Sequence, residues 1–259
     1  MNTAGRVALT QATLSAIPVH LSIVVCLSPW AVDRIDKLRR SFIWTRSATV
    51  SAGMCCVAWE VVCRPKELGG LGIIDLRRFG QALRLRWDWV RKVDPNRTWI
   101  DLPSPSDKAT RALFRAATLM VVGDGTSTLF WQDSWIHGCC VHQIAPVVFA
   151  SVPRAKARIR SVASGLADQA WVSDITGAQT VQVFLQYLDL WERVRGVQLM
   201  PGVPDFVIWC WSADHKYSAA SVYGAMFIGS TSPFGAMLIW ETLAPPKVRF
   251  FFWLALHRC

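Results

Sequence analysis

The sequence predicts an α+β protein with a basic helical N-terminal region, a central β-hairpin and a small C-terminal strand-and-helix unit. Three observations lead to this prediction. Apolar residues recur at helical spacing in two basic segments of the N-terminal part. The pair Asp124-Gly125 separates two apolar runs, which is a hairpin signal. Near the C-terminus, short apolar runs alternate with a turn and a helix-capping serine. We therefore expect regions 1–105, 106–200 and 201–259.

Composition indicates a packed chain with a basic N-terminal part. Hydrophobic residues make up 52% of the 259 residues and charged ones 18%, which excludes a disordered chain. The 14 Trp residues carry much surface that folding must bury. Residues 1–100 hold 15 Lys and Arg against 7 Asp and Glu, so they carry +8 of the total net charge of +10. Such an excess is typical of proteins that bind a polyanion, most often nucleic acid.

The first 32 residues contain a long stretch without charged side chains. We expect a helix over residues 4–16 that ends before Pro18, and a second apolar helix or strand over residues 19–27. A signal peptide or membrane span over residues 7–32 is the alternative, and with it a membrane-inserted or secreted protein. Interspersed polar residues and two prolines favour a buried helix pair instead, so a membrane partner is not expected.

Two basic helices follow. The first begins with Ser28 as its cap and Pro29 in its first turn, and runs to about residue 44. Its apolar face is expected to hold Trp30, Val32, Ile35, Leu38, Phe42 and Ile43. The second runs from Asp75 to about Val93. Between them, the three glycines of ELGGLG predict a tight turn.

Lysine and arginine side chains on and beside these helices are candidates for neutralising nucleic-acid phosphates, with nearby Trp rings available to stack on bases. The alternative, in which the Trp rings are core and the cations are merely solvated, stays open on spacing alone. The candidate residues are Arg34, Lys37, Arg39, Arg40, Lys66, Arg84, Arg86 and Arg91.

The remaining elements follow from local signals. Residues 94–108 contain three prolines and are expected to form a linker. A helix is predicted near residues 181–194, and strand, turn, strand and helix over residues 201–227, with the turn at Asp214-His215 and Ser218 or Ser221 as the helix cap. A final helical unit, residues 236–259, is expected to break at Pro245-Pro246.

No motif predicts catalysis, a cofactor or a bound metal. The cluster His137, Cys139, Cys140 and His142 lies within six residues, and one short loop cannot wrap four ligands around a zinc ion, so we expect a plain loop. The chain has no Asp-Asp pair of the kind that two-metal phosphoryl transfer uses, and no nucleophile with a recognisable base. The eight cysteines are irregularly spaced, which favours free thiols in a reducing compartment, nuclear or cytoplasmic.

Six segments occur in a telling order: AGRVALTQATLSAIPVHL, IDKLRRSFIW, VAWEVVCRPKELGGLGIIDL, ALRLRWDWV, VGDGTSTLFWQDSW and WETLAPPKVRFFFWLALHRC. Together they resemble the region downstream of the polymerase core in LINE-type, non-LTR retrotransposon reverse transcriptases of plants. The resemblance implies that residues 1 to about 45 are similar to the thumb. It also implies that residues from about 205 onward are similar to the start of the reverse-transcriptase zinc-binding module. The residues of that module's opening pattern are Asp205, Trp209, Trp211, Tyr217, Ser218, Ser221 and Tyr223.

The same resemblance implies what this chain lacks. The family's polymerase carboxylates lie upstream of the thumb, and its zinc ligands follow the Phe/Trp-rich helix that here contains the apolar run Phe250 to Leu256. We therefore expect a fragment without polymerase activity and without stoichiometric zinc, in which His257 and Cys259 are not half of a metal site. RNA or an RNA/DNA duplex is the expected partner. The remaining alternative is a non-functional pseudogene product.

Overall fold

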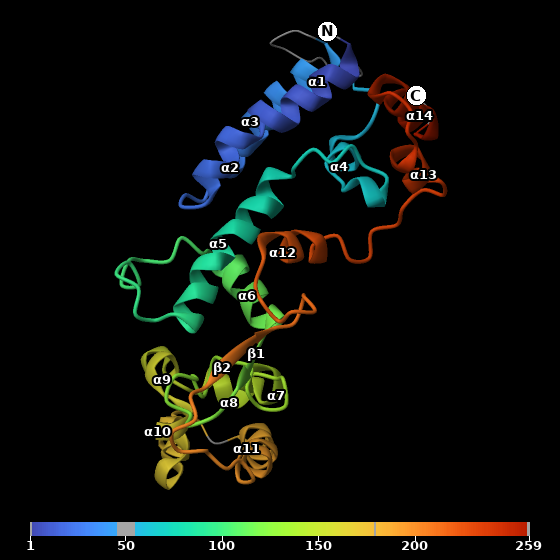
Figure 1. The fold of residues 1–259 in the computed structure, drawn as a ribbon. Coiled ribbons are helices and arrows are strands. Elements are labelled where there is room, and N and C mark those ends of the chain that lie inside the picture. Colours follow the sequence, from blue (N-terminus) through green and yellow to red (C-terminus); the bar gives the residue numbers. More distant parts are fainter. Residues whose placement is uncertain (1, 46–54, 179, 258–259) are drawn as a thin grey trace. The chain divides into compact units, whose positions relative to one another are not determined.

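The computed structural model describes residues 2–45, 55–178 and 180–257 (Figure 1). These residues are mainly helical, with one two-stranded antiparallel sheet, so the predicted α+β class is confirmed. The chain divides into two compact units. Unit 1 comprises residues 1–87, 103–110 and 218–259, and unit 2 comprises residues 88–102 and 111–217. The domain boundaries expected from the sequence, after residues 105 and 200, stay a prediction.

The N-terminus of unit 1 folds as three short helical pieces, α1 (Thr3–Leu9), the π-helical turn η1 (Thr10–Leu14) and α2 (Ala16–Ser22). The prediction that a helix ends before Pro18 is wrong. Pro18 lies in the first turn of α2, where a backbone N–H has no intrahelical acceptor and its loss costs little. The interruption comes at η1 instead, where the Ser15 N–H and hydroxyl both donate to the Thr10 carbonyl, at 3.0 and 2.9 Å.

The two basic helices form where the sequence predicts them. In α3 (Pro29–Trp44), the Ser28 hydroxyl accepts from the Ala31 N–H at 3.2 Å and Pro29 occupies the first turn. At the start of α5 (Leu76–Val93), the Asp75 carboxylate accepts from the backbone N–H groups of Arg77 and Arg78, at 3.0 and 3.1 Å. Local side-chain caps therefore set both starts.

The segment between these helices is short and tightly turned. It contains α4 (Trp59–Val62) and the 3-10 turn η2 (Lys66–Leu68), which ends at Gly69 with a φ of 79°. A Cβ at Gly70 would lie 2.0 Å from the Arg64 carbonyl oxygen, so that position accepts only glycine. The predicted glycine turn is confirmed.

The C-terminal helices of unit 1 are α12 (Ala219–Ala225), α13 (Ala236–Glu241) and α14 (Pro246–Leu256). Ser218 caps α12, and the break at Pro245-Pro246 separates α13 from α14, both as predicted. Trp253 of α14 is fully buried and donates from its indole Nε1 to the Gly69 carbonyl at 2.8 Å. The first and last segments of the sequence therefore share one core, whose buried members are Val7, Ile43, Val57, Val62, Cys63, Leu71, Ile73, Phe250 and Trp253.

In unit 2, strand β1 (Thr118–Val121) pairs with β2 (Phe206–Trp209) rather than with the segment that follows it. The predicted hairpin at Asp124-Gly125 is therefore wrong. The chain after β1 forms a loop around the carboxylate of Asp205, which accepts from the backbone N–H groups of Gly123, Gly125, Ser127 and Thr128 at 2.7–3.0 Å. Because those N–H groups are bonded to a distant side chain, they do not form a hairpin ladder.

The predicted second strand, after β2, is also wrong, because residues 210–218 form turns and loop instead of a strand. The turn at Asp214-His215 is present, with His215 at a φ of 57°, and the Trp209 N–H donates to the His215 carbonyl at 3.1 Å. The Ser212 hydroxyl then donates to the Lys216 carbonyl at 2.8 Å. These bonds close a compact loop that leads directly into the Ser218 cap, so no length is left for a strand.

Helices surround an aromatic core in the rest of unit 2. They are α6 (Lys108–Ala117, whose first residues belong to unit 1), α7 (Val141–Ile144), α8 (Pro146–Ala150), α9 (Arg154–Ile159), α10 (Val162–Leu166), the 3-10 segment η3 (Ala167–Asp174) and α11 (Val181–Val194). The helix predicted near residues 181–194 is confirmed. Phe130, Trp131 and Trp171 are buried together at the centre, with ring centroids 5.0–6.2 Å apart.

A buried ion pair stabilises this core. The Asp174 carboxylate accepts from Arg160 Nε at 2.7 Å and from Trp131 Nε1 at 3.1 Å, and Arg160 Nη2 completes a bidentate contact. Burial by itself raises the pKa of Asp174, but the hydrogen bonds from Arg160 and Trp131 outweigh it, so the pKa lies below its ordinary value.

This lowered pKa predicts acid sensitivity. The stabilisation from Asp174 is complete above the ordinary carboxyl pKa of about 4 and is lost as the pH falls through the lower, folded-state value. We expect Asp174→Asn to lower the free energy of unfolding at pH 7. The difference in this free energy between the variant and the wild type should narrow below pH 4, as measured by urea unfolding from pH 7 to pH 3. Asp189→Asn, at an exposed carboxylate paired with Arg193, is the matched control. A gap that stays constant over this pH range would contradict the assignment.

In the described part of the chain, no helix combines the length and the apolar content that crossing a membrane requires. All the described cysteines are free, and Cys63 and Cys140 are the buried ones.

Candidate nucleic-acid interface

The outer face of α3 combines an exposed indole ring with two cations. Trp30 is 75% exposed, and the side chains of Arg34 and Lys37 are exposed as well. Residues at positions i, i+4 and i+7 of a helix share one face, so these three side chains lie in a row. The apolar face expected for this helix is therefore only partly buried, since Leu38 is 50% exposed as well. The spacing of Trp30 from Arg34 is the signal that could have identified this row.

Two further candidates, Lys66 of η2 and Arg86 of α5, are also exposed. The Lys66 ammonium lies 5.2 Å from the ring centroid of Trp240. Within the described residues, none of the four exposed candidates (Arg34, Lys37, Lys66 and Arg86) forms an ion pair. Their charge is therefore available to a polyanion.

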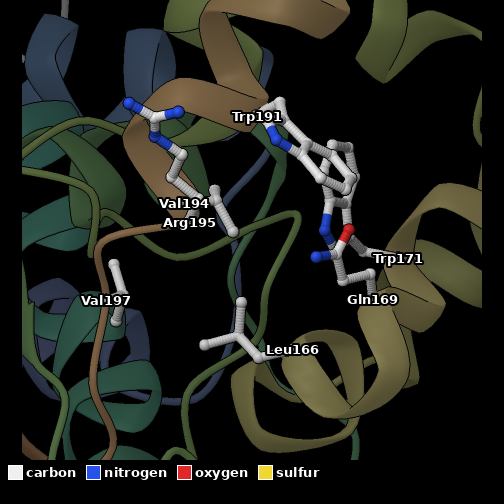
Figure 2. A pocket seen from close by; sticks show the side chains of 7 residues that line it. All are labelled: Leu166, Gln169, Trp171, Trp191, Val194, Arg195 and Val197. Carbon is white, nitrogen blue, oxygen red and sulfur yellow. The ribbon is translucent and has the colours of Figure 1, made fainter.

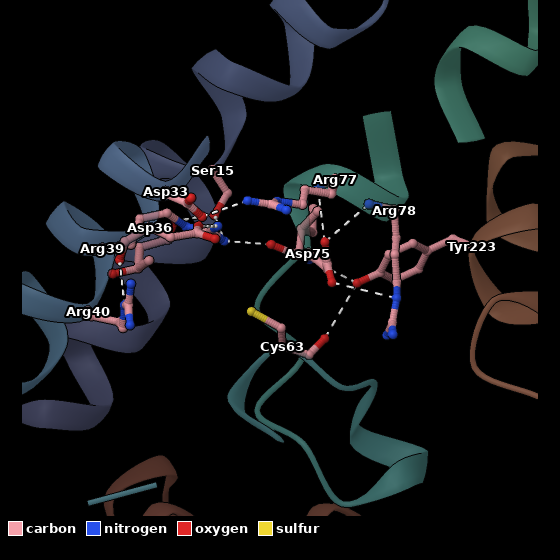
Figure 3. Close-up of polar contacts among 12 residues, drawn as sticks. Ser15, Asp33, Asp36, Arg39, Arg40, Cys63, Asp75, Arg77, Arg78 and Tyr223 are labelled. Carbon is pink, nitrogen blue, oxygen red and sulfur yellow. Dashed lines mark hydrogen bonds and ion pairs between the residues drawn. The ribbon is translucent and has the colours of Figure 1, made fainter. Parts of the chain in front are cut away.

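Arg39 has a different environment from the exposed candidates, and its burial argues against the predicted contact with phosphate. It is 1% exposed, and its guanidinium donates to Asp36 at 2.7 Å, to the Ser15 hydroxyl at 2.9 Å and to the Ile74 carbonyl at 2.7 Å (Figure 3). It also lies 5.4 Å from the ring centroid of Trp59. Since Nη1 and Nη2 of Arg39 donate inside unit 1, this side chain joins the end of η1, α3 and the segment before α5.

The polar contacts around Arg39 continue toward α12. The Asp75 N–H donates to the Tyr223 hydroxyl at 3.0 Å, and that hydroxyl lies 3.5 Å from the Cys63 carbonyl (Figure 3). Burial raises the pKa of Tyr223 to about 12, so this phenol stays protonated and can donate. Burial also raises the pKa of Asp36, and the Arg39 charge offsets this only in part. The network fixes the position of α3 and hence of its outer face.

The other candidates are at least partly enclosed. Arg84 is 4% exposed and its Nη2 lies 3.9 Å from the Asp107 carboxylate, so its burial also argues against a contact with phosphate. Arg40 is half-buried, with Nε 3.3 Å from the Asp36 carbonyl and its guanidinium 5.7 Å from the Trp59 ring centroid. Arg91 belongs to unit 2 and donates to the Leu102 carbonyl.

The His and Cys residues do not converge on a metal-like site. Cys140 caps α7, and His142 stacks edge-on against Phe149, with ring centroids 5.4 Å apart. His257 Nε2 lies 3.1 Å from the Gly69 carbonyl, while Cys259 lies outside the described residues. Across residues 2–45, 55–178 and 180–257, no three His, Cys, Asp or Glu side chains form a group that could hold a metal ion. The expectation of no stoichiometric zinc stays a prediction.

Unit 2 contains a small cavity of about 120 Å³ between η3 and the end of α11 (Figure 2). Leu166, Trp171, Trp191, Val194 and Val197 line it with apolar surface, and the two polar residues at its wall are Gln169 and Arg195. Within the described residues, no side chain lining this cavity has a buried polar atom without a hydrogen-bond partner, and Arg195 is paired with Glu192. This cavity is therefore a packing feature of the aromatic core.

Comparisons with known proteins add one relative. No protein-family model matches the chain, and no solved structure matches it. The chain is similar to a curated Arabidopsis thaliana protein described as "Putative ribonuclease H protein". The two are 25% identical over 284 aligned residues, which cover 97% of this chain and 44% of the relative. The chain thus spans less than half of the relative's length.

Proposed function

We propose that this chain is the nucleic-acid-binding part of a retroelement reverse transcriptase of LINE type, with no polymerase or nuclease activity of its own. The relative's description names a ribonuclease, an enzyme class that acts on RNA, which supports a role with nucleic acid. The ligand of this proposal is RNA or an RNA/DNA duplex.

The observation that carries the proposal is the row Trp30, Arg34 and Lys37 on α3. Proteins that bind single-stranded nucleic acid combine cations along the backbone with aromatic rings on which bases stack. An indole that is 75% exposed has little structural use on the surface of a folded unit, since its burial would stabilise the fold. Beside two cations that form no ion pair with any described residue, this indole suits a base, with the phosphates on Arg34 and Lys37.

A second surface supports the view that the chain belongs to a larger protein. Ile17, Leu21 and Val24, at helical spacing in and just after α2, are 55–66% exposed. Contiguous apolar surface of this kind usually marks a contact with another domain or chain. We propose that this stripe faces the polymerase core in a full-length protein.

The interface predicts a specific loss of binding. Fluorescence anisotropy with labelled single-stranded RNA should give salt-dependent affinity for the wild-type chain. The double variant Arg34→Glu/Lys37→Glu should bind at least about tenfold more weakly and show a salt slope smaller by about two. Trp30→Ala should weaken binding by about tenfold through lost stacking, with little change in that slope.

The matched control is Arg111→Glu/Arg115→Glu. Both arginines are exposed on α6, and the control changes the net charge by the same amount. An equal loss in this control, or wild-type affinity that ignores salt, would contradict the assignment of the site to α3. An activity assay with a primed RNA template should show no DNA synthesis by the wild-type chain.

A further inference from the structure

Unit 1 contains a cavity of about 180 Å³ bordered by α1, η2, α13 and α14. The elements pack against one another in pairs, α1 on α14, α13 on η2 and α13 on α14, and Figure 1 shows these helices gathered at one end of the unit. At about 30 Å³ per water, its volume corresponds to about six water molecules. The lining residues are Ala4, Val7, Ala8, Gln11, Lys66, Leu71, Trp240, Pro246, Arg249 and Phe250.

The charge of this cavity is uniformly positive. Lys66 and Arg249 line it, and none of its described lining residues is acidic. Neither cation forms an ion pair within the part of the chain that the structure describes. Two cations held beside one partly open pocket without a counter-charge favour an anion there.

Hydrogen-bond donors in the wall also lack acceptors. The Trp240 indole Nε1 and the Arg249 Nε are buried and have no hydrogen-bond partner among the described residues. Arg249 Nη1 makes one long contact, 3.4 Å to the Trp240 carbonyl, and Gln11 Nε2 donates to the Leu71 carbonyl at 2.9 Å. Buried N–H groups without acceptors cost free energy, so a group that supplies several acceptor oxygens would be favoured.

We propose that this cavity binds a phosphate group, with Lys66 and Arg249 as counter-charges and Trp240 as a donor. A phosphate offers three or four acceptor oxygens around one centre and suits an arginine fork next to a lysine. The aliphatic wall from α1 and the Phe250 ring would exclude water and strengthen these contacts. The phosphate can belong to a free nucleotide or to a nucleic-acid end. Only the second source rests on the function proposed above.

The test is calorimetric titration of the full chain with inorganic phosphate, with adenosine monophosphate, and with two RNA oligonucleotides that differ only in a 5′-phosphate. We expect phosphate to bind the wild-type chain, and Lys66→Gln and Arg249→Gln each to weaken binding at least about tenfold. Trp240→Phe keeps the ring and removes the donor, so a loss of a few fold is expected. Lys247→Gln is the matched control, since Lys247 is exposed on α14 and does not line the cavity.

The outcomes separate the sources and the proposals. If the 5′-phosphorylated RNA binds more tightly than the RNA without this phosphate, and Lys66→Gln abolishes the difference, the site is assigned to nucleic-acid ends. Binding of adenosine monophosphate without such a preference assigns it to free nucleotides. No binding of phosphate at millimolar concentration, or equal binding by Lys66→Gln and wild type, overturns the phosphate site, while RNA affinity that still depends on Arg34 and Lys37 leaves the α3 interface intact. Lys66 is exposed, so its variant tests the site even if Arg249→Gln fails to fold.

Discussion

Asp205→Ala is expected to destabilise unit 2 by about 3 kcal/mol, a value at the lower end for losing several charge-assisted hydrogen bonds at once, because some of the freed donors can turn to water. The Asp205 carboxylate accepts from four backbone N–H groups and from the hydroxyls of Ser127 and Thr128, at 2.7–3.1 Å. Burial alone would raise the pKa of Asp205, but the N–H donors outweigh it and lower the pKa. The loop after β1 is thus organised around one negative charge.

Asp205→Asn distinguishes charge from shape. Its amide has one acceptor oxygen where the carboxylate has two, so Asp205→Asn should still show part of the destabilisation expected for Asp205→Ala. Asp124→Ala is the matched control, because the Asp124 carboxylate lies in the same loop and, among the described residues, accepts hydrogen bonds from Thr126 alone. Urea unfolding followed by Trp fluorescence provides the measurement. Equal effects of Asp205→Ala and Asp124→Ala would refute the central role of Asp205.

Trp253→Ala is expected to destabilise unit 1 by about 3–5 kcal/mol, the range for removing a fully buried Trp. The Trp253 ring stacks on Phe250 with centroids 5.9 Å apart, and its Nε1 donates to the Gly69 carbonyl at 2.8 Å. Gly69 ends η2, and Trp253 therefore attaches α14 to the glycine turn. Its loss leaves a cavity in the core and removes the indole hydrogen bond to the Gly69 carbonyl, which His257 Nε2 also contacts at 3.1 Å.

Trp253→Phe should cost less, since it retains most of the apolar ring and loses the hydrogen bond. Phe252→Ala is the control on the same helix, because Phe252 is 54% exposed. Thermal unfolding by circular dichroism measures all three. A Phe252→Ala effect as large as that of Trp253→Ala would show that the aromatic run acts as a whole and not through its buried member.

Local signals in the sequence determined the helix starts and several turns. Ser28 with Pro29, Asp75 and Ser218 each act within about three residues of the helix that they begin, so their effect can be predicted without a tertiary structure. The positive φ of Gly69 and the break at Pro245-Pro246 are equally local. The basic character of the N-terminal part follows from composition alone.

Tertiary structure decided which strands pair and whether each Lys or Arg side chain is buried or exposed. The partner of β1 lies more than 80 residues away, and the carboxylate of Asp205 overrides the local preference of Asp124-Gly125 for a hairpin. Arg39 and Arg34 lie on one helix and have the same chemistry, yet Ser15 and Ile74 enclose the first and leave the second exposed. Caps and turns depend on groups a few residues apart, whereas burial and pairing depend on which distant segments pack together. For that reason the sequence by itself determined the elements and the overall charge, and only the tertiary structure showed which cations are buried and which are exposed.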